Sequence, residues 1–303
     1  MAGRKWAALG GLLAVLAWSA AQASNIGVLI LAHGGSEQWN QMVRHCVEAA
    51  NLSCPYEVVL GMGDSDSTPY QTALRNLHSH GAQKIVTIPL LISSHSEVYR
   101  QYEFLLRLRS DPGFPHPMMM AMPGHDSMPA GASQHPAVPL DLGGPVVLTA
   151  ALDSSPFMAQ MLLERALEIS REPGKEILVL VAHGPNDDHD NLLWQKSLDG
   201  WAATLEQRGG FAAVKALTLR DDAPDAVRDQ ATGQLRRLVQ EARSRGQAAI
   251  IVPVLMASGG IEGHISKRLE GLPYRMGRPL LPHPKVSEWI RDQVDRAASE
   301  GGV

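Results

Sequence analysis

The 303-residue sequence has only two cysteines, few aromatic residues (5%) and no excess of basic residues. Its 27 basic and 31 acidic side chains give a formal net charge of −4, so the chain does not attract nucleic acid or anionic lipid non-specifically. It also lacks a P-loop and a Gly-x-Gly-x-x-Gly segment, which excludes the common nucleotide-binding loops. Apolar residues make up 45% of the chain, so we expect a globular protein with a sizeable core.

Long apolar runs are also scarce, and the run at residues 6–21 belongs to an N-terminal export signal. Basic residues precede it, and a small-residue Ala-Gln-Ala sequence ends at Ala23, where we expect cleavage. An uncleaved membrane anchor is the alternative, but the run is too short and its flanks are wrong for a membrane span. The sequence therefore predicts a signal peptide at residues 1–23. We expect an exported, periplasmic protein with no membrane span after cleavage.

The two cysteines are Cys46 and Cys54, and an exported protein enters an oxidising compartment. We expect a disulfide between them, which would tie the end of the first helix to the following strand and add about 2–3 kcal/mol of stability. Two reduced thiols that bind a metal ion are the alternative, although Cys-x7-Cys is not a recognised zinc spacing.

Strand patterns alternate with helical patterns along the chain. Continuous Val, Ile and Leu runs indicate strands that are buried on both faces, and hence parallel α/β sheets. The first half predicts strands at 26–32, 56–61 and 84–92 and helices at about 37–50 and 68–80. The second half predicts strands at 177–182, 214–219 and 248–256 and helices at about 190–208 and 225–245. Each half is expected to close with a fourth strand and helix, in residues 145–167 and 279–294.

The two halves match in detail as well as in order. A glycine turn precedes each third strand, each third strand carries a proline, and Ala-His-Gly ends each first strand. A chance similarity of two generic α/β units does not explain the repeated Ala-His-Gly. We therefore predict an α/β fold of two tandem, Rossmann-like, parallel-sheet halves related by duplication. The expected halves are residues 24–172 and 173–303, divided near the Pro-Gly break at 171–176.

Polar side chains follow the first and third strands of each half. They are His33 with His95 and Glu97 in the first half, and His183 with Glu262 and His264 in the second. Ligands gather beyond the carboxyl ends of parallel strands, and we expect the first and third strands to be neighbours. A His/Glu pair over an open cleft can take up protons or hold a divalent metal ion. The ordinary alternatives are a structural histidine at a turn and polar caps on the next helix.

These features resemble the class II tetrapyrrole chelatases, namely the sirohydrochlorin cobalto- and ferrochelatases. The resemblance rests on the two-half layout, on Ala-His-Gly, on PLLISSHSEV and PVLMASGGIEGH after the third strands, and on RPLLPHPKVSEWI near the end. It covers nearly all of residues 25–295. It implies a chelatase-like enzyme that inserts a divalent metal ion, namely cobalt, iron or nickel, into sirohydrochlorin or a related tetrapyrrole, without a redox cofactor.

The resemblance also implies roles for the strand-end residues. His183 and Glu262 match the pair used in two-half members, and His33 with His95 match the pair used in single-domain members. We therefore expect His183, Glu262 and His33 to be catalytic. The expected metal ligands are His33, His95, Glu97, His183, Glu262 and His264. The second half departs from the family pattern because many relatives place a histidine sooner, so either Glu262 or His264 fills that role.

Two other functions are alternatives to metal insertion. His-Gly-Gly at residues 33–35 resembles the oxyanion-hole segment of esterases, but the chain has no Gly-x-Ser-x-Gly nucleophile elbow. A non-catalytic, exported metal- or tetrapyrrole-binding protein on the same fold is the second alternative. Its support is the unrepeated segment 111–145, rich in Pro, Gly, Met and His, because such ligands suit soft metals. We expect that segment to be an inserted loop, with a plain linker as its alternative, and we expect a metal-supplying partner.

Overall fold

The computed structural model describes residues 25–64, 66–111 and 137–299. The expected signal peptide and most of the expected inserted loop, residues 112–136, lie outside the described residues. No helix within the described ranges is long and apolar enough to cross a membrane.

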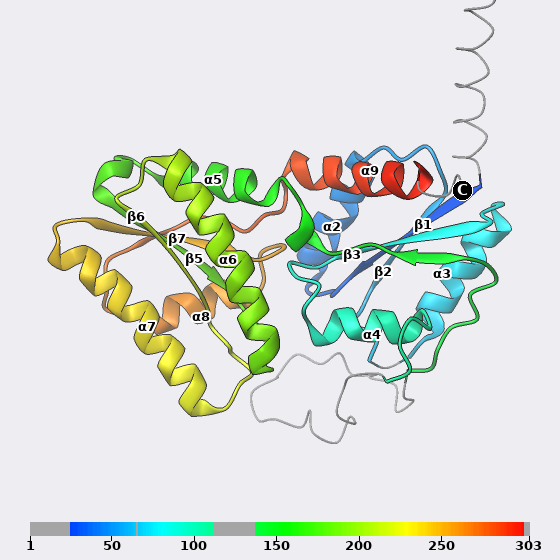
Figure 1. Ribbon diagram of the computed structural model, residues 1–303, viewed down its shortest axis with the longest axis horizontal. Helices are drawn as coiled ribbons and strands as arrows, with labels where there is room; N and C mark the ends of the chain where they lie inside the picture. The colour runs from blue at the N-terminus through cyan, green and yellow to red at the C-terminus, as the bar shows by residue number, and fades with distance from the viewer. Residues whose placement is uncertain (1–24, 65, 112–136, 300–303) are drawn as a thin grey trace, which may run out of the picture.

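The N-terminal half is a parallel sheet flanked by helices (Figure 1). Its strands are β1 (Ile26–Ala32), β2 (Tyr56–Leu60), β3 (Lys84–Leu90) and β4 (Val146–Leu148), in the order β2-β1-β3-β4. Its helices are α2 (Glu37–Ala49), α3 (Thr68–Ser79), α4 (Glu97–Leu105) and α5 (Met158–Ile169). Strand β1 is buried at every position because helices cover both faces of the sheet, as its continuous apolar run predicts.

The C-terminal half repeats this arrangement. Its strands are β5 (Glu176–Ala182), β6 (Ala213–Thr218), β7 (Ala248–Val254) and β8 (Arg275–Met276), in the order β6-β5-β7-β8. Its helices are α6 (Asp188–Gly209), α7 (Asp225–Ser244), α8 (Ile261–Arg268) and α9 (Pro284–Ser299). The predicted pair of parallel-sheet α/β halves is therefore confirmed.

The fourth strand of the C-terminal half does not lie where the sequence predicts. Strand β8 ends at Met276, before residues 279–294, so the prediction of a strand within that segment is wrong. Two prolines at 279 and 282 remove backbone donors from the segment. Its remaining N–H groups at Leu280 and Leu281 donate to carbonyls just beyond β7, at distances of 3.0 and 2.7 Å. This segment connects the sheet to α9 without forming a strand.

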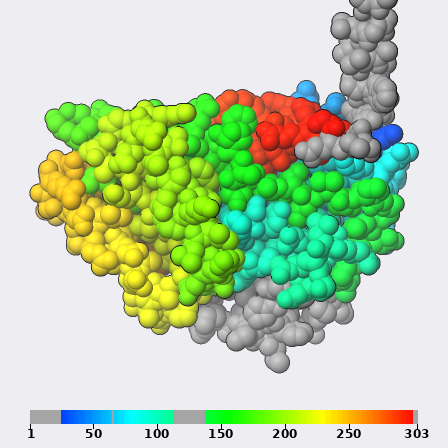
Figure 2. Space-filling model, viewed as in Figure 1, coloured from blue at the N-terminus to red at the C-terminus, as the bar shows by residue number. Residues whose placement is uncertain are grey.

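The last helix of each half packs on the other half. Helix α9 contacts α2 and β3 of the N-terminal half, whereas α5 contacts α6 and β7 of the C-terminal half (Figure 1). One apolar cluster under α2, α5, α6 and α9 is consequently shared by both sheets. Two smaller clusters belong to single halves, one under α3 and α4 and the other under α7 and α8. The halves adjoin as two lobes in space-filling view (Figure 2). The division into residues 24–172 and 173–303 stays a prediction, and this packing crosses it.

The expected disulfide is absent: Cys46 and Cys54 are both free and buried. The Cys46 Sγ lies 3.5 Å from the Ser287 hydroxyl of α9, and that hydroxyl donates to the Cys46 carbonyl at 2.8 Å. Burial raises the pKa of both thiols. The prediction of a disulfide is therefore wrong for this structure, because Cys46 contacts Ser287 of α9 rather than Cys54.

Candidate functional site

The C-terminal ends of β1, β3, β5 and β7 carry the predicted site residues. Strand β1 pairs with β3 and β5 pairs with β7, so the expected neighbouring of first and third strands is confirmed. The backbone turns sharply after each first strand, where Gly34 and Gly184 have φ values of +80° and +77°. A Cβ at Gly184 would lie 2.5 Å from the Thr218 Cβ, so only glycine fits there without a shift.

His183 faces a carboxylate that follows the neighbouring strand β6. Its Nε2 lies 3.3 Å from Oδ2 of Asp222, and its side chain remains 32% exposed, so water moderates the effect of burial. Burial lowers the pKa of His183. The hydrogen bond to Asp222, the charges of Asp222 and Asp221, and a hydrogen bond to the Gly184 backbone outweigh burial, so the pKa is raised above its ordinary value. Acceptors at Asp222 and Gly184 favour the imidazolium form of the ring.

Arg220 holds the loop that carries His183. Its backbone N–H donates to the His183 carbonyl at 2.7 Å. Its guanidinium donates to the carbonyls of Pro185 (3.1 Å) and Asn186, and to the carboxylate of Asp188 (2.6 Å). The side chain thus satisfies backbone groups of a loop that has no strand or helix of its own.

The other two predicted residues of the C-terminal half lie in the first turn of α8. Glu262 accepts the N–H of Gly259 at 3.1 Å, in an exposed position. His264 Nδ1 lies 3.1 Å from Oδ2 of Asp221, which also pairs with Arg268. The structure therefore joins His264 to Asp221, the neighbour of the carboxylate that His183 contacts.

Sequence analysis missed the three charged residues that follow β6, namely Arg220, Asp221 and Asp222. The signal was present, since Arg-Asp-Asp comes directly after the predicted strand at 214–219. Only the ends of the first and third strands were considered, although β6 lies beside β5 and its carboxyl end reaches the same edge of the sheet.

His33 has simpler surroundings in the N-terminal half. It is exposed, and its Nδ1 lies 2.8 Å from the Gly34 carbonyl oxygen, to which it can donate. Within the described residues no hydrogen bond engages its Nε2. The neutral tautomer with a proton on Nδ1 presents the Nε2 lone pair to solvent, which is the form that binds metal ions or accepts a proton.

His95 lies in the segment between β3 and α4, and Glu97 is the first residue of α4. The His95 N–H donates to the Ser93 hydroxyl at 3.1 Å. The Ser96 hydroxyl caps α4 by accepting the N–H of Tyr99 at 3.2 Å, so the alternative interpretation of helix capping is confirmed for that serine. Neither the His95 ring nor the Glu97 carboxylate makes this cap.

Glu97 faces the C-terminal half. Burial raises the pKa of Glu97, Arg100 opposes this effect, and the charges of Asp190, Asp222 and Asp187 add to it. These three carboxylates belong to the C-terminal half, and Asp222 is the partner of His183. We call residues 93–100 together with residues 183–194 and Asp222 the inter-half junction. It brings Glu97 into the electrostatic field of the His183–Asp222 pair.

The described residues contain no ready-made metal site. In residues 25–64, 66–111 and 137–299, no three His, Cys, Asp or Glu side chains are grouped closely enough to hold a metal ion. The roles expected for the six strand-end residues therefore stay predictions. Glu97 and His183 share the junction, whereas Glu262 lies on α8 and its carboxylate accepts the N–H of Gly259, three residues earlier.

Comparison with known proteins identifies the fold and the N-terminal half. The CbiX family matches residues 27–169, which include His33, His95 and Glu97. The N-terminal half therefore belongs to the CbiX class II chelatase family. No curated protein sequence matches this chain significantly.

Two solved structures share the fold of this chain over most of its length. SirB from Bacillus subtilis with Fe3+ is 16% identical, with a TM-score of 0.63, and the match covers 92% of this chain and 98% of SirB. The sirohydrochlorin chelatase SirB from Bacillus subtilis subspecies spizizenii in complex with cobalt is 13% identical, with a TM-score of 0.59 and coverages of 92% and 97%. At these identities the likeness shows the fold alone, and its span agrees with tandem chelatase halves.

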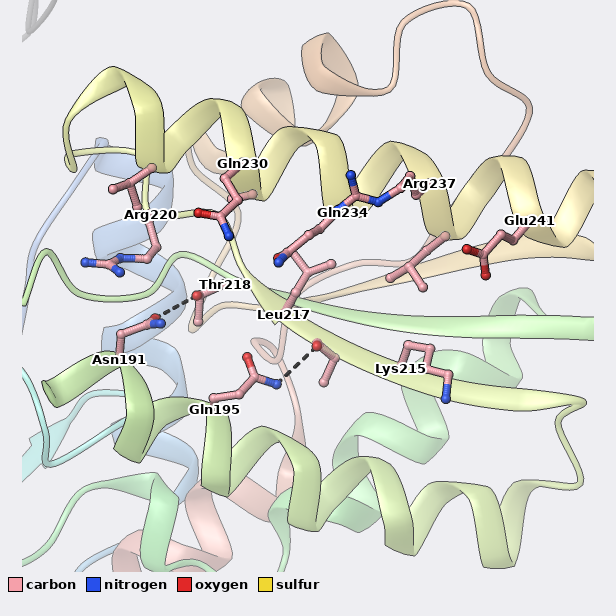
Figure 3. Close-up of a pocket in the computed structure, with 14 residues that line it drawn as sticks. Asn191, Gln195, Lys215, Leu217, Thr218, Arg220, Gln230, Gln234, Arg237 and Glu241 are labelled. Carbon is pink, nitrogen blue, oxygen red and sulfur yellow. Dashed lines mark hydrogen bonds between the residues drawn. The ribbon is translucent and has the colours of Figure 1, made fainter. Parts of the chain in front are cut away.

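A groove of about 520 Å³ lies along the outer edge of β6 between α6 and α7, and it shares only Asn191 with the junction (Figure 3). There Gln195 donates to the Ala216 carbonyl at 3.1 Å, and the Thr218 hydroxyl donates to the Asn191 side chain at 2.7 Å. These bonds occupy polar groups along an edge strand. The lining includes none of the six predicted site residues, so the junction and not the groove is the candidate site.

Proposed function

We propose that this chain inserts a divalent metal ion, cobalt or iron, into sirohydrochlorin or a closely related tetrapyrrole. One observation carries the proposal: a CbiX-family half presents Glu97 to the His183–Asp222 pair of the second half. The metals and the activity named for the SirB structures support the choice of substrate.

The chemistry of insertion suits these side chains. Two pyrrole N–H protons must leave the tetrapyrrole, and the hydrated metal ion must shed water. His33 offers Nε2 to the incoming metal ion. Glu97, whose pKa is raised, takes up a proton more readily than an ordinary carboxyl group. The raised pKa of His183 likewise makes its neutral ring a stronger proton acceptor than an ordinary histidine.

Electrostatics favour the approach of a cation to the junction. Asp187, Asp190 and Asp222 all act on Glu97, and Arg100 neutralises only part of their charge. A concentration of carboxylates raises the local concentration of divalent ions and their rate of encounter. Asp187 also caps α6 by accepting the Asp190 N–H at 2.8 Å, and acidic side chains are favourable at the N-terminus of a helix.

The test is an insertion assay with metal-free sirohydrochlorin and cobalt(II), followed by absorbance. We expect many turnovers per protein molecule, and His45→Ala, at an exposed histidine outside the junction, as an unaffected control. Stoichiometric binding of tetrapyrrole or metal without turnover would instead support the non-catalytic binding protein. Absence of both binding and turnover would refute the proposal.

We further propose that the protein is exported and works in the periplasm after cleavage behind Ala23. The support is the basic start, apolar run and small-residue end of residues 1–23. Mass spectrometry of the protein recovered from a periplasmic fraction should give a chain that starts at Ser24. A full-length chain that sediments with membranes would favour the uncleaved anchor.

A further inference from the structure

The segment between β3 and α4 is held from its own half by one carboxylate. Asp153 accepts the Ser94 N–H at 2.8 Å, the Ser94 hydroxyl at 2.9 Å and the Ser93 hydroxyl at 3.2 Å. The Ser94 hydroxyl in turn accepts the Ala151 N–H at 2.9 Å. These bonds hold Ser93 and Ser94 in place, and they involve neither His95 nor Glu97.

The opposite side of the segment is held by α6 of the other half. The indole Nε1 of Trp194 donates to the His95 carbonyl at 2.6 Å. One turn earlier on α6, the buried carboxylate of Asp190 lies 2.7 Å from the Arg100 guanidinium on α4. The two contacts therefore lie on either side of Glu97 in the sequence. Both link the C-terminal half to the segment that carries predicted metal ligands.

We propose that Trp194 and Asp190 are positioning residues, through which the C-terminal half sets the placement of His95 and Glu97 for metal binding by the N-terminal half. The proposal rests on the proposed function. It assigns to the second half a task in the chemistry of the first, across the junction and through backbone and guanidinium contacts rather than through contact with substrate.

A second tryptophan on the same helix separates this role from ordinary packing. Trp201 lies two helical turns after Trp194, is also partly buried, and packs against the same apolar cluster. Its indole makes no hydrogen bond to another described residue. Trp194→Phe removes the donor while it keeps most of the ring, and Trp201→Phe makes the same chemical change without loss of a contact to the segment.

The corresponding segment of the C-terminal half lacks this arrangement. The prolines of β3 and β7 share a register, so His95 corresponds to Gly259. A Cβ at Gly259 would lie 4.0 Å from Trp39 Cδ1 of the N-terminal half, and the Gly259 N–H donates to the Glu262 carboxylate of its own half. A tryptophan from the opposite half thus reaches both segments, but an indole hydrogen bond holds only the segment with His95.

The first measurement is hydrogen exchange of residues 91–100 in full-length variants, which does not depend on activity. We expect exchange of this segment to be about tenfold faster in Trp194→Phe than in Trp201→Phe, as for a local opening favoured by loss of one hydrogen bond. Equal exchange in the two variants would overturn the proposal, whether or not the protein inserts metal.

The second measurement is insertion kinetics. We expect Trp194→Phe to raise the KM for cobalt(II) by about tenfold with a melting temperature close to that of Trp201→Phe, because misplaced ligands weaken metal capture without unfolding the chain. Asp190→Asn should also raise the KM for cobalt(II). In a double variant with Arg100→Gln, Asp190→Asn should raise the KM little beyond the value for Arg100→Gln alone, because the two residues form one pair. An unchanged KM in Trp194→Phe would overturn the proposal. Absence of insertion in the wild-type protein would refute the proposed function alone, since hydrogen exchange still decides the positioning.

Discussion

The first-strand histidines of the two halves stand on matching glycine turns but differ in their partners. His183 has a carboxylate at its Nε2, supplied by Asp222, and a raised pKa. His33 has only the Gly34 carbonyl at its Nδ1 among the described contacts. An unengaged ring nitrogen suits metal binding, whereas a paired and basic ring suits proton uptake. The two halves thus share the turn and differ in the chemistry of its histidine.

The segments after the third strands differ in the same way. In the N-terminal half, serines of the segment bond to Asp153. Trp194 of the other half also donates a hydrogen bond to this segment. The segment of the C-terminal half is Ala-Ser-Gly-Gly, which offers fewer side chains for such bonds. We infer that the N-terminal half binds the metal ion and that the C-terminal half supports it. The family match to residues 27–169 supports this division.

The largest expected effect comes from replacing the two first-strand histidines, one at a time. His33→Ala should lower the rate of metal insertion by about 10²- to 10⁴-fold. His183→Ala should lower it less, by about tenfold, because Asp222 and water can still take up protons. Steady-state insertion rates at saturating tetrapyrrole measure both variants. A greater loss in His183→Ala would place the reaction in the C-terminal half, as the resemblance to two-half members implies.

A large effect on stability should follow from the helix exchange. Arg165 on α5 is 2% exposed, and its guanidinium donates to the carbonyls of Leu280 and Pro282 and to Glu168. Arg165→Met removes the guanidinium donor of the Leu280 and Pro282 carbonyls, while Glu168 keeps its pair with Arg278, and this should lower the free energy of unfolding by about 2–4 kcal/mol.

The control for Arg165→Met shares one of its partners. Arg278→Met also loses a pair with Glu168, but the Arg278 side chain is 57% exposed, so we expect a loss below about 1 kcal/mol. Urea unfolding at constant pH measures both losses. Similar values for the two variants would show that the buried link between the halves contributes no special stability.

A smaller effect should separate the two glycine turns. Alanine at either Gly34 or Gly184 is strained by a positive φ, at a cost of about 1–3 kcal/mol. At Gly184 the added Cβ would also lie 2.5 Å from Thr218 Cβ, whereas at Gly34 the nearest atoms are 3.4 Å away. Thermal unfolding should therefore show a lower melting temperature for Gly184→Ala than for Gly34→Ala. Equal melting temperatures would mean that the β6 side chain moves away freely.

The smallest expected effect is a pH dependence of stability from His183. Its pKa in the folded protein is raised above the ordinary value of about 6.5, so its stabilisation is present below that pH. The stabilisation is lost as the pH rises through the raised pKa. Asp222→Asn removes the charge that stabilises the imidazolium, so the difference in melting temperature from wild type should be largest below about pH 6.5 and should shrink as the pH rises through the raised pKa. Asp199→Asn, at an exposed residue of α6, serves as control. A difference that grows with pH would contradict the assignment.

Much of the fold follows from local sequence pattern. Strands β1, β3, β5 and β7 are continuous apolar runs, which predict buried strands, and glycines mark the turns that follow the first strands. The helix exchange does not follow, because an amphipathic pattern shows that a helix has an apolar face but not which sheet it covers. The disulfide prediction is wrong for the same reason, since the partner of Cys46 is Ser287 of a helix far along the chain.

The candidate site is predictable only in part. The His and Glu positions follow from the ends of the strands, and the structure brings Glu97 towards the His183–Asp222 pair. The supporting residues Trp194 and Arg220 act through backbone carbonyls of other segments. Sequence spacing carries no information on such contacts, because they depend on how two sheets meet.

The position of α9 affects how the N-terminal half can fold during synthesis. Residues 284–299 cover α2 and β3, which are made some two hundred residues earlier. Until those late residues have been synthesised, an apolar face of the N-terminal half has no cover, and the half cannot reach its final form. A nascent or truncated chain is therefore expected to expose this apolar face, which only the late residues of α9 cover.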